Sequence, residues 1–148
     1  MKNVSVYNEK GINVDKKMVH NLVKMICTGM NLHLNSLEIN FVNTETLTKI
    51  NRDYLEHNYA TDIITFDYSG EKNNLDGEIF ISFRDAFENS KKYHVTVDNE
   101  LLRLIVHGIL HLVGHDDTTV AKRKKMKLIE DEYVSKLNNF TKGLTFRK

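Results

Sequence analysis

The chain has 148 residues, of which 41% are hydrophobic, and this predicts one domain over residues 1–148 with a single apolar core. Its 21 basic and 20 acidic residues leave a formal net charge of +1, which excludes a strong overall field for capturing a polyanion. Cys27 is the only cysteine, which excludes an internal disulfide and a cysteine-rich zinc cluster. Residues 1–6 lack the apolar run of a secretory signal, and no later stretch approaches the ~20 apolar residues of a membrane span. We therefore expect a cytoplasmic protein without a membrane partner.

Hydrophobic periodicity predicts strands and helices in an order without strict βαβ alternation. The expected strands lie at 4–7, about 37–42, 62–68 and 78–82, with a loop at 69–76, and the expected helices run from the N-cap Asp15 to about Met30, around 47–54, and at about 83–93, 98–113 and 118–137. This order favours an α+β fold, in which helices pack mainly on one face of a mixed sheet of about four strands.

Two histidines four residues apart mark the segment whose pattern predicts chemistry. His107 and His111 lie on the expected helix at 98–113, so their rings project from the same face and can bind one ion. Gly114 favours a helix stop or a sharp turn, after which the carboxylate of Asp117 can return as a third ligand. Two imidazoles and one carboxylate leave a fourth position for water, which is typical of a catalytic zinc site. The expected metal site therefore lies on a core helix and the turn after it.

Other interpretations of this segment compete with a zinc site. Paired helical histidines often have no ligand, but this helix is apolar, and histidines without a partner would be costly to bury there. His115 would extend an i, i+4, i+8 row if the helix continued, although Gly114 argues against continuation. Zinc proteases of the H-E-x-x-H type carry their general-base glutamate directly after the first histidine, where this chain has Gly108. The pattern predicts metal binding without the main residue of peptide hydrolysis.

The run from His107 to Asp117 resembles the H-G-x-L-H-L-x-G-x-D-H signature of the YbeY endoribonucleases. Residues 61–66 are similar to the T-D-V-L-S-F strand of that family, and residues 77–81 to its G-D-I-x-I strand. The resemblance implies a zinc-dependent, single-strand-specific endoribonuclease with one zinc ion per chain and no nicotinamide or nucleotide cofactor. It also implies a role in ribosomal RNA processing, chiefly 3′ end maturation of the small-subunit 16S rRNA, and in ribosome quality control. Ribosomal RNA and the ribosome would be the partners.

The chain departs from the family pattern at two places. The third ligand of the family is usually histidine, whereas this chain has Asp117. We interpret this as a substitution, because a carboxylate is an adequate zinc ligand and also suits manganese or magnesium. The family commonly has an arginine, expected to hold substrate phosphate, where this chain has Leu55. Arg52 or His57 could supply that contact, and a solvated helix end is the alternative for each.

A basic run from Lys122 to Lys127 begins the last expected helix, where the positive end of the helix dipole disfavours cations. Lys122, Lys124 and Lys125 are therefore candidate RNA contacts, with an ordinary solvated helix face as the alternative. No catalytic residue beyond the metal ligands can be assigned, because water and the RNA 2′-hydroxyl are both candidate nucleophiles. Two alternative functions stay open, namely another zinc hydrolase such as a peptidase, and a non-catalytic ribosome-binding protein with structural zinc.

Overall fold

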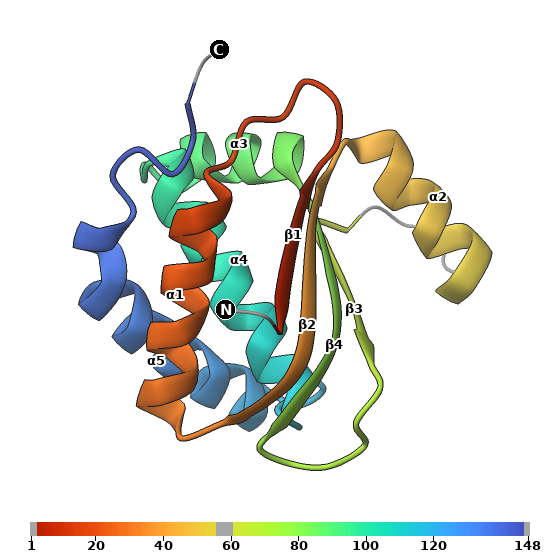
Figure 1. Cartoon of the computed structure of the whole chain (residues 1–148), viewed down its shortest axis with the longest axis vertical. Helices are drawn as coiled ribbons and strands as arrows, with labels where there is room; N and C mark the ends of the chain where they lie inside the picture. The colour runs from red at the N-terminus through yellow and green to blue at the C-terminus, as the bar shows by residue number, and fades with distance from the viewer. Residues whose placement is uncertain (1–2, 56–60, 147–148) are drawn as a thin grey trace.

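The computed structural model describes residues 3–55 and 61–146, which form one four-stranded sheet with helices on both faces (Figure 1). The elements in chain order are β1 (Val4–Asn8), α1 (Lys16–Met30), β2 (His33–Val42), α2 (Thr44–Leu55), β3 (Ile63–Asp67), β4 (Asn74–Ser82), α3 (Phe83–Lys92), α4 (Val97–Leu112), α5 (Val120–Leu137) and the short 3₁₀ helix η1 (Asn138–Phe140). The expected α+β class is confirmed.

The strand order is β1-β2-β4-β3, with β1 and β4 each parallel to β2, and β3 antiparallel to β4. The expectation of a mixed sheet is therefore confirmed. Both central strands are longer than expected, because His33 at the start of β2 pairs with Asn74 at the start of β4. These first residues are mostly polar and lack clean apolar alternation, yet their backbones belong to the ladder. The connection between β3 and β4 is accordingly shorter than the expected loop.

The main core lies between the sheet and helices α1, α4 and α5. Alternate residues of the two central strands are fully buried there, among them Leu37, Ile39, Phe41, Ile79 and Ile81. Helix α4 packs directly on β3 and β4. A Cβ atom at Gly108 would lie 2.8 Å from Ile79 Cδ1 and 3.2 Å from Ile63 Cδ1. Glycine at this position therefore lets α4 approach the sheet more closely than a side chain would.

Helix α2 covers the opposite face of the sheet from α1 and α4 (Figure 1). Its Leu47 is buried in a second, smaller cluster with Val42 and Ile64. The expectation that helices pack mainly on one face is thus confirmed, with α2 on the other face. Among the described residues, no helix combines the length and the apolar character needed to cross a bilayer.

Candidate metal centre

The C-terminal end of α4 sets the position of the site. The N–H of His115 donates to the carbonyl of Leu110 at 3.0 Å, and the N–H of Gly114 donates to the carbonyl of His111 at 3.2 Å. These two bonds form a Schellman motif, in which Gly114 has a φ of +103° that favours glycine. The motif ends the helix and turns the chain, so Asp117 lies near His111 rather than one turn further along the axis.

The three expected ligands meet at this turn. The Nε2 atoms of His107 and His111 are 3.1 Å apart. Asp117 Oδ2 lies 3.8 Å from His111 Nε2. One donor atom from each of the three residues lies within 4.8 Å of the others. The helix ends before His115, so the alternative row of three histidines does not form.

This donor set fits a zinc ion. Two Zn–N bonds of about 2.0–2.1 Å at a tetrahedral angle place their nitrogens about 3.3 Å apart. The observed separation of 3.1 Å between the histidine Nε2 atoms is close to that value. Imidazole nitrogen and carboxylate oxygen also suit other divalent ions such as manganese. The geometry therefore supports a divalent metal site with three protein ligands.

The two histidines have different electrostatic surroundings. Burial lowers the pKa of His107, but the hydrogen bond and the charge of Glu130, followed by the charges of Asp117 and Asp62, raise it, and the net shift is upward. Burial and the nearby charge of His107 lower the pKa of His111. His111 therefore loses its proton more readily, as a metal ligand must.

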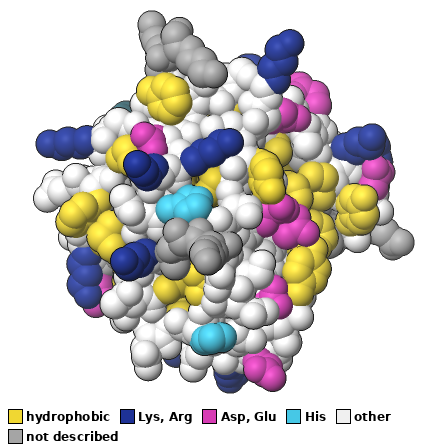
Figure 2. Space-filling view, viewed as in Figure 1, with side chains coloured by type: hydrophobic (Ala, Val, Ile, Leu, Met, Phe, Trp, Pro, Cys, Tyr) yellow, Lys and Arg dark blue, Asp and Glu magenta, His cyan; other side chains and the backbone are white. Residues whose placement is uncertain are grey.

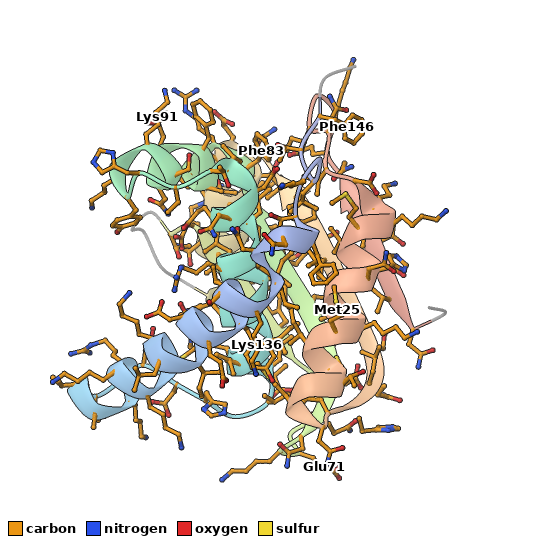
Figure 3. All side chains as sticks on the ribbon, turned by 90° about the vertical axis from the view of Figure 1, so that its left-hand side faces the viewer. Met25, Glu71, Phe83, Lys91, Lys136 and Phe146 are labelled. Atoms are coloured by element: carbon orange, nitrogen blue, oxygen red, sulfur yellow. The ribbon has the colours of Figure 1, made fainter. Side chains whose placement is uncertain are left out.

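Sequence reasoning missed Glu130, whose Oε2 lies 2.6 Å from Nδ1 of His107. This carboxylate comes from α5, which crosses α4 in the view of Figure 3. Only 8% of Glu130 is exposed, and it lies on the same helix face as the buried residues Met126, Tyr133 and Leu137. An acidic residue at the apolar spacing of α5 was the sequence signal that could have revealed it.

A cavity of about 460 Å³ opens beside His107 and Asp117. The basic residues Arg103, Arg123 and Lys127 are among those that line it. Arg123 Nη1 also donates to the backbone carbonyl of Asp117 at 3.2 Å, which ties the start of α5 to the ligand turn. Arg123 and Lys127 both belong to the basic run from Lys122 to Lys127, which was expected to contact RNA, although only Lys122, Lys124 and Lys125 were named as individual contacts. The four-residue spacing of Arg123 and Lys127 was the available signal, because it places both on one helix face.

The expected RNA contacts are distributed differently. Lys122 Nζ pairs with Asp116 Oδ2 at 3.2 Å, whereas Lys124 and Lys125 are exposed. Burial and then the charges of Lys125 and Lys72 lower the pKa of His115, which places Lys125 near the ligand turn. These three lysines line no part of the cavity beside the ligands.

The remaining two expected contacts come from the region of α2. Arg52 lies in the last turn of α2, is 60% exposed at its side chain, and pairs with Asp53 at 3.3 Å. It does not line the cavity beside the ligands. His57 falls outside the described residues.

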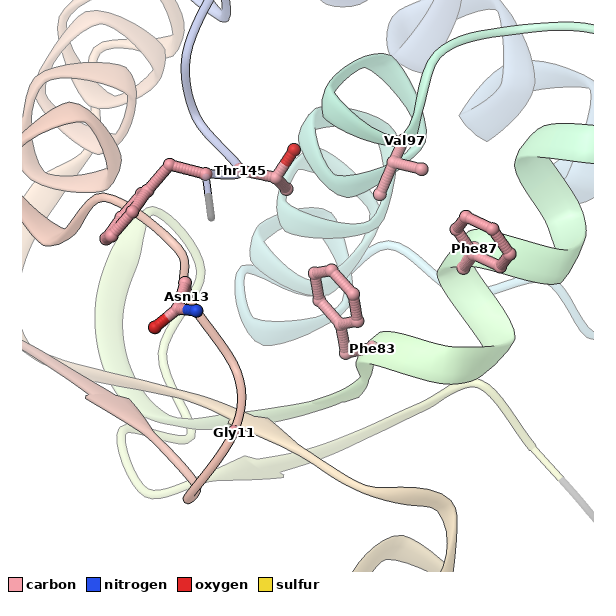
Figure 4. Close-up of a pocket in the computed structure, with 7 residues that line it drawn as sticks. Gly11, Asn13, Phe83, Phe87, Val97 and Thr145 are labelled. Atoms are coloured by element: carbon pink, nitrogen blue, oxygen red, sulfur yellow. The ribbon is translucent and has the colours of Figure 1, made fainter. Parts of the chain in front are cut away.

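A larger cavity of about 660 Å³ lies at the other end of α4, between α3 and the C-terminal segment (Figure 4). Phe83 and Phe87 of α3 and Val97 of α4 form much of its wall. The described residues that line it include no acidic, basic or histidine side chain. Chemistry is therefore expected at the smaller cavity, beside the candidate ligands.

Comparison with known proteins finds a family model, described as endoribonuclease YbeY, that matches residues 3–138. The endoribonuclease YbeY of Chlorobaculum tepidum is 32% identical over 136 residues, which covers 92% of this chain and 98% of that protein. The protein of the same name from Cytophaga hutchinsonii is 44% identical over 101 residues, covering 67% of this chain and 71% of that protein. That of Bacteroides fragilis is 35% identical over 129 residues, with coverages of 85% and 92%.

A solved structure supports the fold independently. The solution structure of TM1509 from Thermotoga maritima matches with a TM-score of 0.62 at 25% identity, covering 90% of this chain and 88% of that chain. The family model spans nearly the whole chain, and relatives more than 30% identical cover most of it. With the candidate ligands placed together at the end of α4, these matches show that the chain belongs to the YbeY family of endoribonucleases.

Proposed function

We propose that this protein is a metal-dependent endoribonuclease that acts in ribosomal RNA processing and in ribosome quality control. One observation carries the proposal: the cavity beside His107 and Asp117 brings candidate metal ligands together with the cations Arg123 and Lys127. Cleavage of a phosphodiester needs positive charge at the phosphoryl oxygens, and cations that hold neighbouring phosphates favour it further. Family membership supports RNA as the polymer that is cut.

We propose zinc as the metal, at one ion per chain, held by His107, His111 and Asp117. When bound, zinc would polarise a phosphoryl oxygen and could also ionise a coordinated water. The H-E-x-x-H peptidases carry their general-base glutamate directly after the first histidine. This chain has Gly108 there, packed on the sheet, so the position holds no carboxylate. RNA cleavage tolerates this, because the neighbouring 2′-hydroxyl is an internal nucleophile, whereas an amide also needs its nitrogen protonated on departure.

The RNA is proposed to be single-stranded and to pass along the start of α5. Arg123 and Lys127 face the cavity, and Lys122, Lys124 and Lys125 extend the positive charge over the exposed side of the same helix. An unpaired strand can bring one phosphate down to recessed ligands, which a rigid duplex does less readily. Arg52 is a further candidate contact. The family commonly has an arginine where this chain has Leu55, so a different basic residue would have to hold that phosphate.

The biological substrate is proposed to be precursor ribosomal RNA, chiefly at the 3′ end of the small-subunit 16S rRNA. The ribosome would then be the partner, and the cytoplasm the location. These parts of the proposal rest on the family resemblance, and the local basic run supports them because a chain of net charge +1 needs such a run to hold RNA.

Purified protein loaded with zinc should cleave single-stranded RNA, cleave duplex RNA less, and leave casein intact. A chelator and His107→Ala should both abolish RNA cleavage. His33→Ala is the matched control, because His33 is exposed at the start of β2 and lines no part of the cavity beside the ligands. Zinc-dependent casein cleavage without RNA cleavage would replace the proposal with a peptidase. Inactivity on all three substrates, with zinc still bound, would favour a structural zinc site.

A further inference from the structure

The imidazole of His107 is hydrogen-bonded at Nδ1 to a carboxylate on another helix. We propose that Glu130 is a positioning residue, which fixes the ring of His107 through Nδ1 so that Nε2 points at the metal ion. This inference rests on the proposed metal centre of His107, His111 and Asp117. It concerns a residue outside that ligand set.

The geometry assigns one tautomer to the neutral ring. Glu130 Oε2 lies 2.6 Å from His107 Nδ1, slightly shorter than the about 2.7–2.9 Å usual for a charge-assisted hydrogen bond between nitrogen and oxygen. A carboxylate only accepts hydrogen bonds, so the proton of the neutral imidazole stays on Nδ1. The lone pair of His107 Nε2 then faces the Nε2 atom of His111 at 3.1 Å. The ring is thus oriented from α5, independently of the α4 backbone that carries it.

Glu130 is itself held in place by Arg103, one turn before His107 on α4. Arg103 Nη1 lies 3.4 Å from Glu130 Oε1, and Arg103 Nη2 lies 2.8 Å from Asp131 Oδ1. The contacts therefore link Asp131 on α5 to Arg103 on α4, Arg103 to Glu130 on α5, and Glu130 to His107 on α4. Such bracing limits the rotamers of Glu130 and hence the orientation of the ring.

A purely structural tie between α4 and α5 explains this arrangement less well. Asp131 already neutralises Arg103 at 2.8 Å, whereas Glu130 is 3.4 Å from that guanidinium. The nearest partner of Glu130 is the imidazole at 2.6 Å. A carboxylate that is only 8% exposed on an apolar helix face is costly to bury unless it is well partnered. The contact that compensates for this cost is the one with the metal ligand.

The test is the zinc affinity of the full-length protein, measured by competition with a chromophoric chelator. Glu130→Ala should weaken zinc binding by about 10–100-fold, the range usual for loss of a residue that hydrogen-bonds to a metal ligand. Glu130→Gln should weaken it less, because the amide oxygen still accepts from Nδ1. Glu132→Gln is the matched control, since Glu132 lies on the same helix, is 56% exposed and pairs with Lys136. Its zinc affinity should equal that of the wild type.

Nitrogen-15 NMR of the imidazoles reports on His107 Nδ1 directly, and this signal would not change if Glu130 only tied the two helices together. In the zinc-loaded wild type, the Nδ1 proton of His107 should be protected from exchange, and in Glu130→Ala that protection should be lost. If zinc-free Glu130→Ala has a disturbed circular dichroism spectrum, Glu130→Leu, which fills similar space without an acceptor, replaces it. An affinity within about twofold of the wild type in the folded variant that lacks the acceptor would overturn the role of Glu130 while the proposed nuclease stands. Failure of the wild type to bind zinc would instead overturn the metal centre itself.

Discussion

His107 and His111 lie one turn apart on α4, yet within residues 3–55 and 61–146 only His107 has a carboxylate at hydrogen-bond distance from its Nδ1 atom. The spacing of the two histidines was visible in the sequence, because helix periodicity alone places both rings on one side. Glu130 was not visible in this way, since it reaches His107 through the packing of α5 on α4. Contacts between helices depend on how the helices cross, which local sequence patterns do not specify.

We predict that the zinc content of single-substitution variants will distinguish the proposed ligands His111 and Asp117 from the neighbouring His115. His111→Ala and Asp117→Ala should each weaken zinc binding by about tenfold or more, because each removes a donor atom. His115→Ala should keep about one zinc per chain, because His115 follows the helix end and stands outside the ligand group. Elemental analysis after gel filtration measures the metal content. Full occupancy in His111→Ala would show that the ion is bound elsewhere.

Helix ends and strand ends differed in how well they could be predicted. The stop of α4 followed from Gly114, and the start of α1 from Asp15, whose side chain accepts the N–H of Met18 at 3.0 Å. The predicted strands began about four residues later than β2 and β4 do, and 74–76 were predicted as loop, because the polar side chains there hide the period of the strand. The pairing of β2 with β4 is parallel and joins segments about forty residues apart, which is set by the whole sheet.

At the end of α4, which carries the proposed ligands His107 and His111, we predict that Gly114→Ala lowers both stability and zinc affinity. A Cβ there would lie 3.4 Å from Lys72 Cγ, an ordinary contact, so the cost comes from the φ of +103°. We expect a loss of about 1–2 kcal/mol in the free energy of unfolding by urea. Weaker zinc binding should accompany it, because the turn before Asp117 must change its path.

Gly70→Ala provides the matched control for this substitution. Gly70 has a φ of +65°, and a Cβ at this position would have no atom within 4 Å. It lies in the connection between β3 and β4, so the substitution should lower stability by a similar amount and leave zinc affinity unchanged. Equal zinc affinity in Gly114→Ala and the wild type would mean that the Schellman turn does not position Asp117.

Over the whole molecule, positive charge is local rather than global. The lysine and arginine side chains visible in Figure 2 are scattered among acidic and apolar ones, in agreement with the net charge of +1. The sequence predicted this balance directly, and it also located the basic run at the start of α5. It could not show that Arg123 and Lys127 face the cavity, because that depends on how α5 is rotated against α4.

The corresponding prediction concerns the salt dependence of RNA binding. Replacing Lys124 and Lys125 with glutamine should weaken the binding of a labelled single-stranded RNA. It should also reduce the slope of log affinity against log salt by about 1.4, or about 0.7 for each phosphate that the variant no longer neutralises. The control replaces Lys16 and Lys17, which are exposed on α1 and line no part of the cavity beside the ligands. An unchanged slope in the Lys124 and Lys125 variant would identify these lysines as a solvated face.

The close packing at Gly108 has an evolutionary consequence. A single nucleotide change can convert some glycine codons to glutamate, which would give this chain the H-E-x-x-H pattern of zinc peptidases. The first atom of that side chain would already lie 2.8 Å from Ile79 Cδ1, so the carboxylate would enter the packed layer between helix and sheet. Overpacking of this kind should lower the stability of such a mutant by about 1–3 kcal/mol. Smaller side chains at Ile63 on β3 and Ile79 on β4 would relieve the contact. An ancestral or laboratory lineage that acquires a glutamate at position 108 is therefore expected to carry such changes.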